Sequence, residues 1–150
     1  MQLIDGKELA KTIREDVSRR VAKMDRVPCL CVLLVGDDPA SHLYVSLKQK
    51  HAEEVGVRLE LIKKPASVST EELIAQVEDW NARKGVDAIL VQLPLPNQHD
   101  ENRVIAAIDP KKDVDGFHPV NREALLQGEP IIVSPVHEGV LRLIASTPIE

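Results

Sequence analysis

Aromatic residues are scarce in this sequence of 150 residues. They make up 2% of the chain, and Tyr44, Trp80 and Phe117 are the complete set. Proteins that grip single-stranded nucleic acid stack bases on several aromatic rings, so the scarcity excludes a platform of that kind. Because 43% of the residues are hydrophobic, we expect a globular domain whose core consists of aliphatic side chains.

A basic charge, long apolar runs and a secretion signal are also lacking. The formal net charge is −5, which argues against a nucleic-acid partner because such proteins carry basic patches. No apolar run approaches the roughly 20 residues that span a bilayer, so we expect no membrane partner. The first residues turn charged at once instead of forming an apolar signal segment. We therefore expect a cytoplasmic protein.

Cysteines are few, and glycines are never clustered. Cys29 and Cys31 lie two positions apart in an apolar run, which in a strand puts them on one face without the geometry of a disulfide. We interpret them as buried structural residues and expect no metal site, because no further ligand lies at a suitable spacing. The seven glycines form neither G-x-G-x-x-G nor a P-loop, so the sequence has no recognisable cradle for a nucleotide phosphate.

Helical and strand-like patterns alternate along the chain. Apolar periodicity predicts strands at 29–35, 57–62 and 88–93. It predicts helices at 5–21, at 41–56, from a capping box at Ser69 through Trp80, at 102–108, near Glu123 and from about Glu138. This alternation favours an α/β fold, a layered open sheet that is mostly parallel and flanked by helices. Ligands of such sheets bind beyond the carboxyl ends of the strands, which points to the loops at 36–41 and 94–100.

Polar residues near these loops have ordinary structural explanations as well as functional ones. Tyr44 and Lys48 are four residues apart and share a helix face, although a half-buried tyrosine beside a solvated lysine is the simpler interpretation. Gln92 ends a buried strand, where its amide needs a partner that local backbone can supply. Asp113 and Asp115 fit an Asx-turn, and their spacing does not continue as a calcium-binding loop.

Taken together, these segments resemble the methylenetetrahydrofolate dehydrogenase/methenyltetrahydrofolate cyclohydrolase family, often called FolD. The matching segments are VGDDPAS at 35–41, Tyr44 with Lys48, LVQLPLP at 90–96 and KDVDGFHPVN at 112–121. The resemblance implies that Tyr44 stacks against a folate and that Lys48 is the catalytic lysine. It also implies that Gln92 holds and tunes Lys48, and that Asp115 binds the pterin ring.

The resemblance also implies an activity and a domain plan. Residues 1–150 are expected to form one folate-binding catalytic domain, with Ser41, Pro94 and Leu95 also contacting the substrate, a tetrahydrofolate derivative. The expected reaction is hydrolysis of 5,10-methenyltetrahydrofolate to 10-formyltetrahydrofolate. Oxidation of 5,10-methylenetetrahydrofolate would need NADP and the Rossmann domain that follows in the family and has no counterpart here. A non-catalytic folate-binding or regulatory module is the alternative.

The end of the sequence departs from the family pattern. The usual Pro-Cys-Thr-Pro-x-Gly is replaced by SPVHEG at 134–139, in which only Gly139 survives. The chain stops where the nucleotide domain of the family begins, and we favour an isolated N-terminal domain over natural loss of the second half. Family members form homodimers largely through the nucleotide domain, so this chain is compatible with a monomer. We also expect exposed apolar surface near the last helix.

Overall fold

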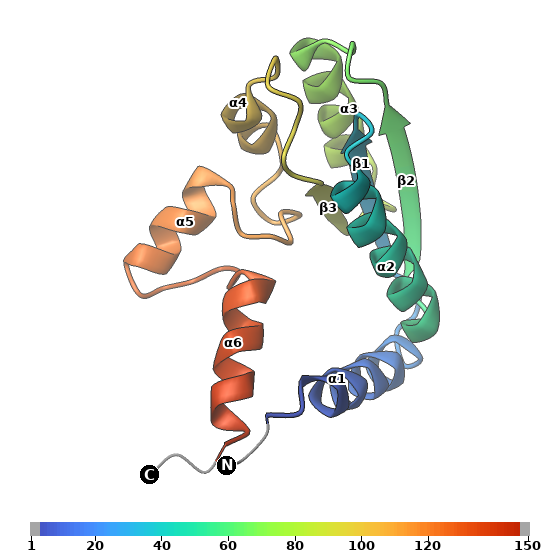
Figure 1. The fold of residues 1–150 in the computed structure, drawn as a ribbon, viewed down its shortest axis with the longest axis vertical. Coiled ribbons are helices and arrows are strands. Elements are labelled where there is room, and N and C mark those ends of the chain that lie inside the picture. Colours follow the sequence, from blue (N-terminus) through green and yellow to red (C-terminus); the bar gives the residue numbers. More distant parts are fainter. Residues whose placement is uncertain (1–3, 148–150) are drawn as a thin grey trace.

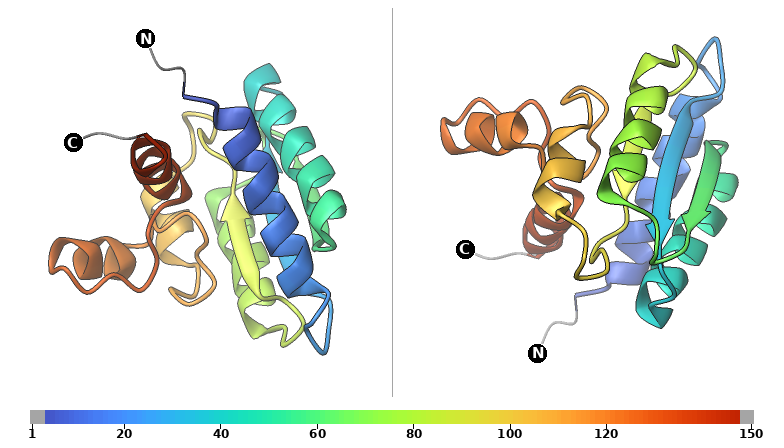
Figure 2. Two further views of the ribbon diagram at one scale, coloured as in Figure 1. Left: turned by 90° about the horizontal axis from the view of Figure 1, so that it is seen from below. Right: turned by 90° about the horizontal axis from the view of Figure 1, so that it is seen from above.

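The structure is a computed structural model that describes residues 4–147. A three-stranded parallel sheet with strand order β2-β1-β3 lies at its centre. Helices α1 and α2 lie on one face of the sheet, and α3 lies on the other (Figures 1 and 2). In chain order the elements are α1 (Gly6–Val21), β1 (Cys29–Val35), α2 (Pro39–Val55), β2 (Arg58–Lys64), α3 (Thr70–Ala82), β3 (Ala88–Val91), α4 (Glu101–Ala106), α5 (Pro119–Leu126) and α6 (Pro135–Ala145).

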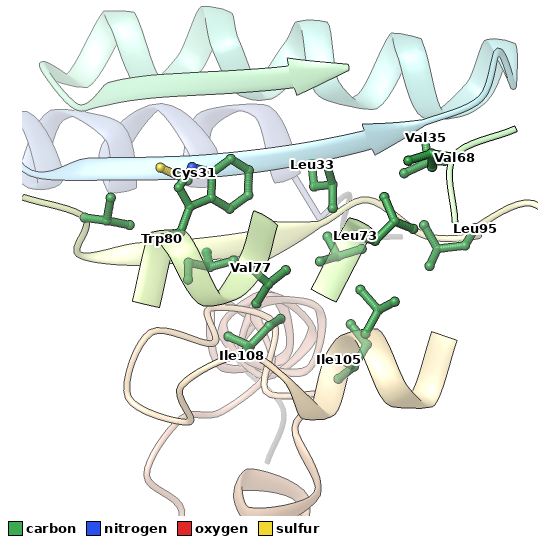
Figure 3. Packing of buried hydrophobic residues seen from close by; sticks show 14 of the residues in the cluster. Cys31, Leu33, Val35, Val68, Leu73, Val77, Trp80, Leu95, Ile105 and Ile108 are labelled. Carbon is green, nitrogen blue, oxygen red and sulfur yellow. The ribbon is translucent and has the colours of Figure 1, made fainter. Parts of the chain in front are cut away.

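The sheet separates two clusters of buried aliphatic side chains. The cluster on the α3 side, shown in Figure 3, includes Cys31, Leu33, Leu73, Val77 and Trp80. The cluster on the α2 side consists of Val32, Leu34, Val45 and Leu90. Strand β1 supplies residues to both, because successive side chains of a strand point to opposite faces. A strand covered on both faces is apolar throughout, which explains the continuous run CLCVLLV and confirms the predicted α/β fold.

Local signals in the sequence fix most helix ends. Asp38 caps α2 through the backbone N–H of Ser41, and the helix stops at Gly56, whose φ is +81°. Glycine adopts this left-handed conformation without steric cost. Helix α3 begins with a complete capping box between Ser69 and Glu72. The structure thus confirms the predicted start of α3 and the predicted end of α2.

Several boundaries differ from the prediction: β2 ends at Lys64 rather than at residue 62, α2 begins at Pro39 rather than at residue 41, and α4 ends at Ala106 rather than at residue 108. Two further differences involve prolines. Strand β3 ends at Val91 rather than at residue 93, and the prolines at 94 and 96 that follow have no N–H with which to extend the ladder. Helix α6 begins at Pro135, three residues before the expected start. Proline suits the first position of a helix because the N–H that it lacks would have no helical partner there.

The last helix leaves much apolar surface uncovered. Val136, Val140, Leu141 and Ile144 of α6 are all exposed, as we expected for this part of the chain. Among residues 4–147, no helix combines the length and apolarity needed to cross a bilayer.

Candidate active site

Lys48 and Gln92 meet at the carboxyl end of the sheet. Lys48 lies on α2 with its side chain half-buried, and its Nζ donates to Gln92 Oε1 over 2.8 Å. Gln92 is the first residue after β3, and its Nε2 donates to the carbonyl oxygen of Leu93 over 2.7 Å. The glutamine side chain therefore bonds both to the local backbone and to Lys48. Because its oxygen accepts only, it orients the lysine amine without adding a charge.

Lys48 is also coupled electrostatically to Asp115. Burial lowers the pKa of the Lys48 amine below its usual 10.5, and the Asp115 carboxylate partly opposes this shift. Burial raises the pKa of Asp115, with Lys48 opposing and Asp113 reinforcing the shift. The pKa values of both groups are thus shifted toward neutral pH, as is common for groups that transfer protons in active sites.

A buried carboxylate holds the loop that carries Asp115. The Asp113 side chain is only 1% exposed. Its Oδ1 accepts from Gly116 N over 3.1 Å, and its Oδ2 accepts from His118 N and Asn121 Nδ2 over 2.9 Å each. Gly116 has φ +70°. The turn expected from the sequence is therefore present, with Asp113 making its hydrogen bonds and Asp115 left to face the charge of Lys48.

Tyr44 lies one turn before Lys48 and is 58% exposed. With Lys48, Leu30 and Leu90 it lines a hollow of about 460 Å³ between the helices and the sheet. The exposed ring is available to stack on a flat ligand. Ser41, at the start of the same helix, is buried and its N–H donates to Asp38 Oδ2 over 2.7 Å.

The loop after β3 is anchored from α4. Its Leu93–Pro94 peptide bond is cis, and the Pro94 ring is exposed. The Leu95 side chain, by contrast, is buried in the α3-side cluster (Figure 3). Its backbone N–H donates to Glu101 Oε2 over 2.8 Å. Of the two residues of this loop that we expect to contact the substrate, the structure leaves only Pro94 open to solvent.

A second hollow, of about 490 Å³, has Leu93, Gly116 and Phe117 among its lining residues. Leu93 directly follows Gln92 in the sequence and Gly116 directly follows Asp115, so both predicted site loops contribute to this hollow, whereas Lys48 and Tyr44 line the first one. Such concave, mostly apolar surfaces with a few polar groups are typical of small-molecule sites.

Two residues that the sequence patterns do not single out support the loops of the site. Glu101 fixes the proline-rich loop, and Asn121 bonds both Asp113 and the carbonyl oxygen of Pro110. Asn121 belongs to a segment that carries the family resemblance, but its type alone indicates no partner. Glu101 follows the helix cap Asp100, where an acidic residue is expected for helix stability alone.

Comparison with known proteins decides the family. A sequence profile of the tetrahydrofolate dehydrogenase/cyclohydrolase catalytic domain matches residues 4–115. The chain belongs to this family. It is 49% identical over 152 residues to the bifunctional protein FolD of Geobacillus thermodenitrificans, a match that covers 99% of this chain and 54% of that protein. The chain spans about half the length of the curated relatives it matches.

Solved structures of FolD enzymes share the fold. The bifunctional enzyme FolD of Campylobacter jejuni matches with a TM-score of 0.93 and 35% identity, covering 97% of this chain and 53% of that one. FolD of Trypanosoma brucei, solved with NADP cofactor and an inhibitor, matches with a TM-score of 0.94 and 33% identity, covering 99% of this chain and 52% of that one. These matches confirm the resemblance and the fold class inferred from the sequence.

Proposed function

We propose that this chain is a folate-binding catalytic domain that hydrolyses 5,10-methenyltetrahydrofolate to 10-formyltetrahydrofolate. The observation that carries the proposal is the half-buried Lys48 amine, which is held 2.8 Å from Gln92 Oε1 and coupled to Asp115. Membership in the family and the hollow lined by Lys48 and Tyr44 support a folate as the substrate.

In the proposed reaction, Lys48 acts as the general base and acid. Its lowered pKa makes the neutral amine accessible closer to physiological pH than that of an exposed lysine. The neutral amine takes a proton from a water molecule as the water oxygen bonds to the cationic methenyl carbon. The protonated lysine then gives that proton to the folate nitrogen as the carbon–nitrogen bond of the five-membered ring breaks. The formyl product forms with release of one proton to solvent.

Tyr44 and Asp115 bind the pterin in this proposal. A carboxylate accepts two parallel hydrogen bonds from a planar group that carries adjacent N–H donors, as the pterin edge does. The Tyr44 ring lies on the same helix as Lys48, one turn away, and is exposed enough to cover one face of the substrate. Pro94 lies in the loop that follows Gln92 and is exposed. Ser41 and Leu95, the other two predicted contacts, are both buried.

The family's cofactor NADP does not fit the residues of this chain. The seven glycines are too dispersed to form a phosphate-binding turn, and 52–54% coverage of the relatives leaves their other half without a counterpart here. We therefore derive no hydride transfer from these 150 residues and propose the hydrolytic reaction alone.

Lysine substitution on one helix tests the proposal. Hydrolysis is followed by the loss of methenyltetrahydrofolate absorbance for the wild-type chain, Lys48→Met and Lys50→Met, after subtraction of the buffer rate. Lys50 lies on the same helix with its side chain 67% exposed, so its variant is the matched control. We expect Lys48→Met to lose turnover and Lys50→Met to keep it. Equal turnover in Lys48→Met and wild type would refute the role of Lys48.

The second candidate function is a folate-binding module without turnover. Calorimetry, which measures folate binding, together with the hydrolysis assay distinguishes it from the catalytic domain. It predicts that the wild-type chain binds the folate, that Tyr44→Ala weakens binding, and that no hydrolysis exceeds the buffer rate. The exposed apolar face of α6 favours this candidate, because a domain that depends on a covering partner can bind without being fully assembled for catalysis. If the chain neither binds the folate nor hydrolyses it, both candidate functions are contradicted.

A further inference from the structure

Two thiols and a carboxylate converge near the amino end of β1, away from Lys48. The side chains of Cys29 and Cys31 both point to the α3 side of the sheet, and Cys31 is paired with Glu60 in the register of β1 and β2. Cys29 Sγ lies 3.7 Å from Glu60 Oε1, and Cys31 Sγ lies 3.8 Å from Glu60 Oε2. One ligand atom from each residue lies within 4.8 Å of the other two.

These separations are close to those around a tetrahedral zinc ion. Bonds of about 2.3 Å to sulfur and about 2.0 Å to oxygen, at a tetrahedral angle, place the two ligand atoms about 3.5 Å apart. The two sulfur–oxygen distances, 3.7 and 3.8 Å, exceed this value by only a few tenths of an ångström, and they run to different oxygens of Glu60. A rotation of the Glu60 carboxylate that brings one oxygen toward both sulfurs closes the triangle around an ion.

The surrounding charges suit a bound cation with three anionic ligands. A divalent ion with two thiolates and a carboxylate has a net charge of −1. Arg83 donates to both Glu60 oxygens over 3.1 and 2.8 Å, and Arg58 lies 3.4 Å from Oε1. These guanidinium groups offset the extra negative charge and orient the carboxylate, which keeps lone pairs for a metal.

We propose that Cys29, Cys31 and Glu60 form a binding site for a thiophilic divalent cation of the zinc class, with water as the fourth ligand. Binding forms two metal–sulfur bonds and one metal–oxygen bond, breaks two S–H bonds and releases both protons to solvent. No electrons are transferred. The ion links β1 to β2 and stabilises the folded chain by mass action. The site is independent of the proposed folate chemistry at the other end of the strands.

The hydrogen bonds of the metal-free site predict a proton count. Cys29 and Cys31 each donate from sulfur to a Glu60 oxygen, so each thiol has a proton to lose when its sulfur binds the ion. Release of about two protons per ion is the signature of binding through both thiols.

The test adds Cd²⁺ or Zn²⁺ to the metal-free wild-type chain. We expect one equivalent of Cd²⁺ to produce thiolate charge-transfer absorption and one equivalent of Zn²⁺ to release about two protons. Cys29→Ser and Cys31→Ser should lose the absorption, and Arg83→Gln should weaken binding roughly 10- to 100-fold. The control is His51→Gln, which removes a surface imidazole 2.9 Å from Glu54 and should leave binding unchanged.

Several results would overturn the site. The absence of charge-transfer absorption at one equivalent, or of proton release, excludes thiolate ligation in the wild-type chain. Wild-type affinity in Cys31→Ser, or loss of binding in His51→Gln, places the ion elsewhere. If the serine variants do not fold, alkylation of the wild-type thiols decides: bound Cd²⁺ should slow it at least about tenfold, and unchanged alkylation contradicts the proposal.

Discussion

Replacing the buried carboxylate of Asp113 by an amide should loosen the loop that carries Asp115. Asp113 accepts three hydrogen bonds on two oxygens, whereas asparagine has one accepting oxygen. An asparagine that keeps the two bonds at Oδ2 turns its NH2 group toward the N–H of Gly116. The loss of one charge-assisted bond, with a donor left buried, costs about 1.5–3 kcal/mol. This corresponds to a fall in Tm of roughly 3–12 °C for a chain of this size.

Urea unfolding of Asp113→Asn, followed by circular dichroism, measures this cost. The matched control is Asp25→Asn, which removes an exposed carboxylate in the segment between α1 and β1 and should change the free energy of unfolding by less than about 0.5 kcal/mol. We also expect Asp113→Asn to raise the Kd for the folate, because Asp115 loses its fixed position. A free energy of unfolding equal to that of the control would refute the reasoning.

Two further substitutions test other parts of the structure. Asp87 accepts hydrogen bonds from Arg26 and from the N–H of Cys29, and Arg26 holds the pKa of the Asp87 carboxyl below its usual 3.8. Because water screens this partly exposed pair, Asp87→Asn should lower the free energy of unfolding at pH 7 by only about 1 kcal/mol. The deficit should shrink as the pH falls below 3.8 and through the lowered pKa, since the wild-type carboxyl then becomes neutral too; a deficit that does not change over this range contradicts the reasoning. Tyr44→Ala should raise the folate Kd roughly 5- to 150-fold, the equivalent of about 1–3 kcal/mol of stacking. Leu43→Ala, at a neighbouring exposed position, is its control, and equal effects would argue against stacking.

Much of the fold follows from local patterns in the sequence. The run at 29–35 has the length and β-branched content of a buried strand, and Gly56 marks the end of α2. Trp80 lies in the core as expected, since a lone large aromatic at helical spacing belongs on the buried face. Family resemblance, rather than spacing, selected Lys48 and Gln92, and the structure then placed their side chains in contact.

Other features depend on distant residues that no local pattern links. Glu60 reaches the cysteines only through the register of β1 with β2, so a search for ligands near the cysteine pair could not find it. Leu95 follows an exposed proline, yet its side chain turns into the core, because the bond from its N–H to Glu101 sets the path of the loop. Helix α6 starts early, at Pro135, because proline is favoured at the first position of a helix. Apolar periodicity carries no information about this preference.

The pH dependence of methenyltetrahydrofolate hydrolysis by the wild-type chain tests the central claim most directly. Lys48 acts as a base in its neutral form, and burial lowers the pKa of its amine below 10.5. After subtraction of the buffer rate, turnover should therefore fall as the pH drops through this lowered pKa, and Lys48→Met should show no turnover at any pH. A wild-type profile that Lys48→Met reproduces would contradict the account.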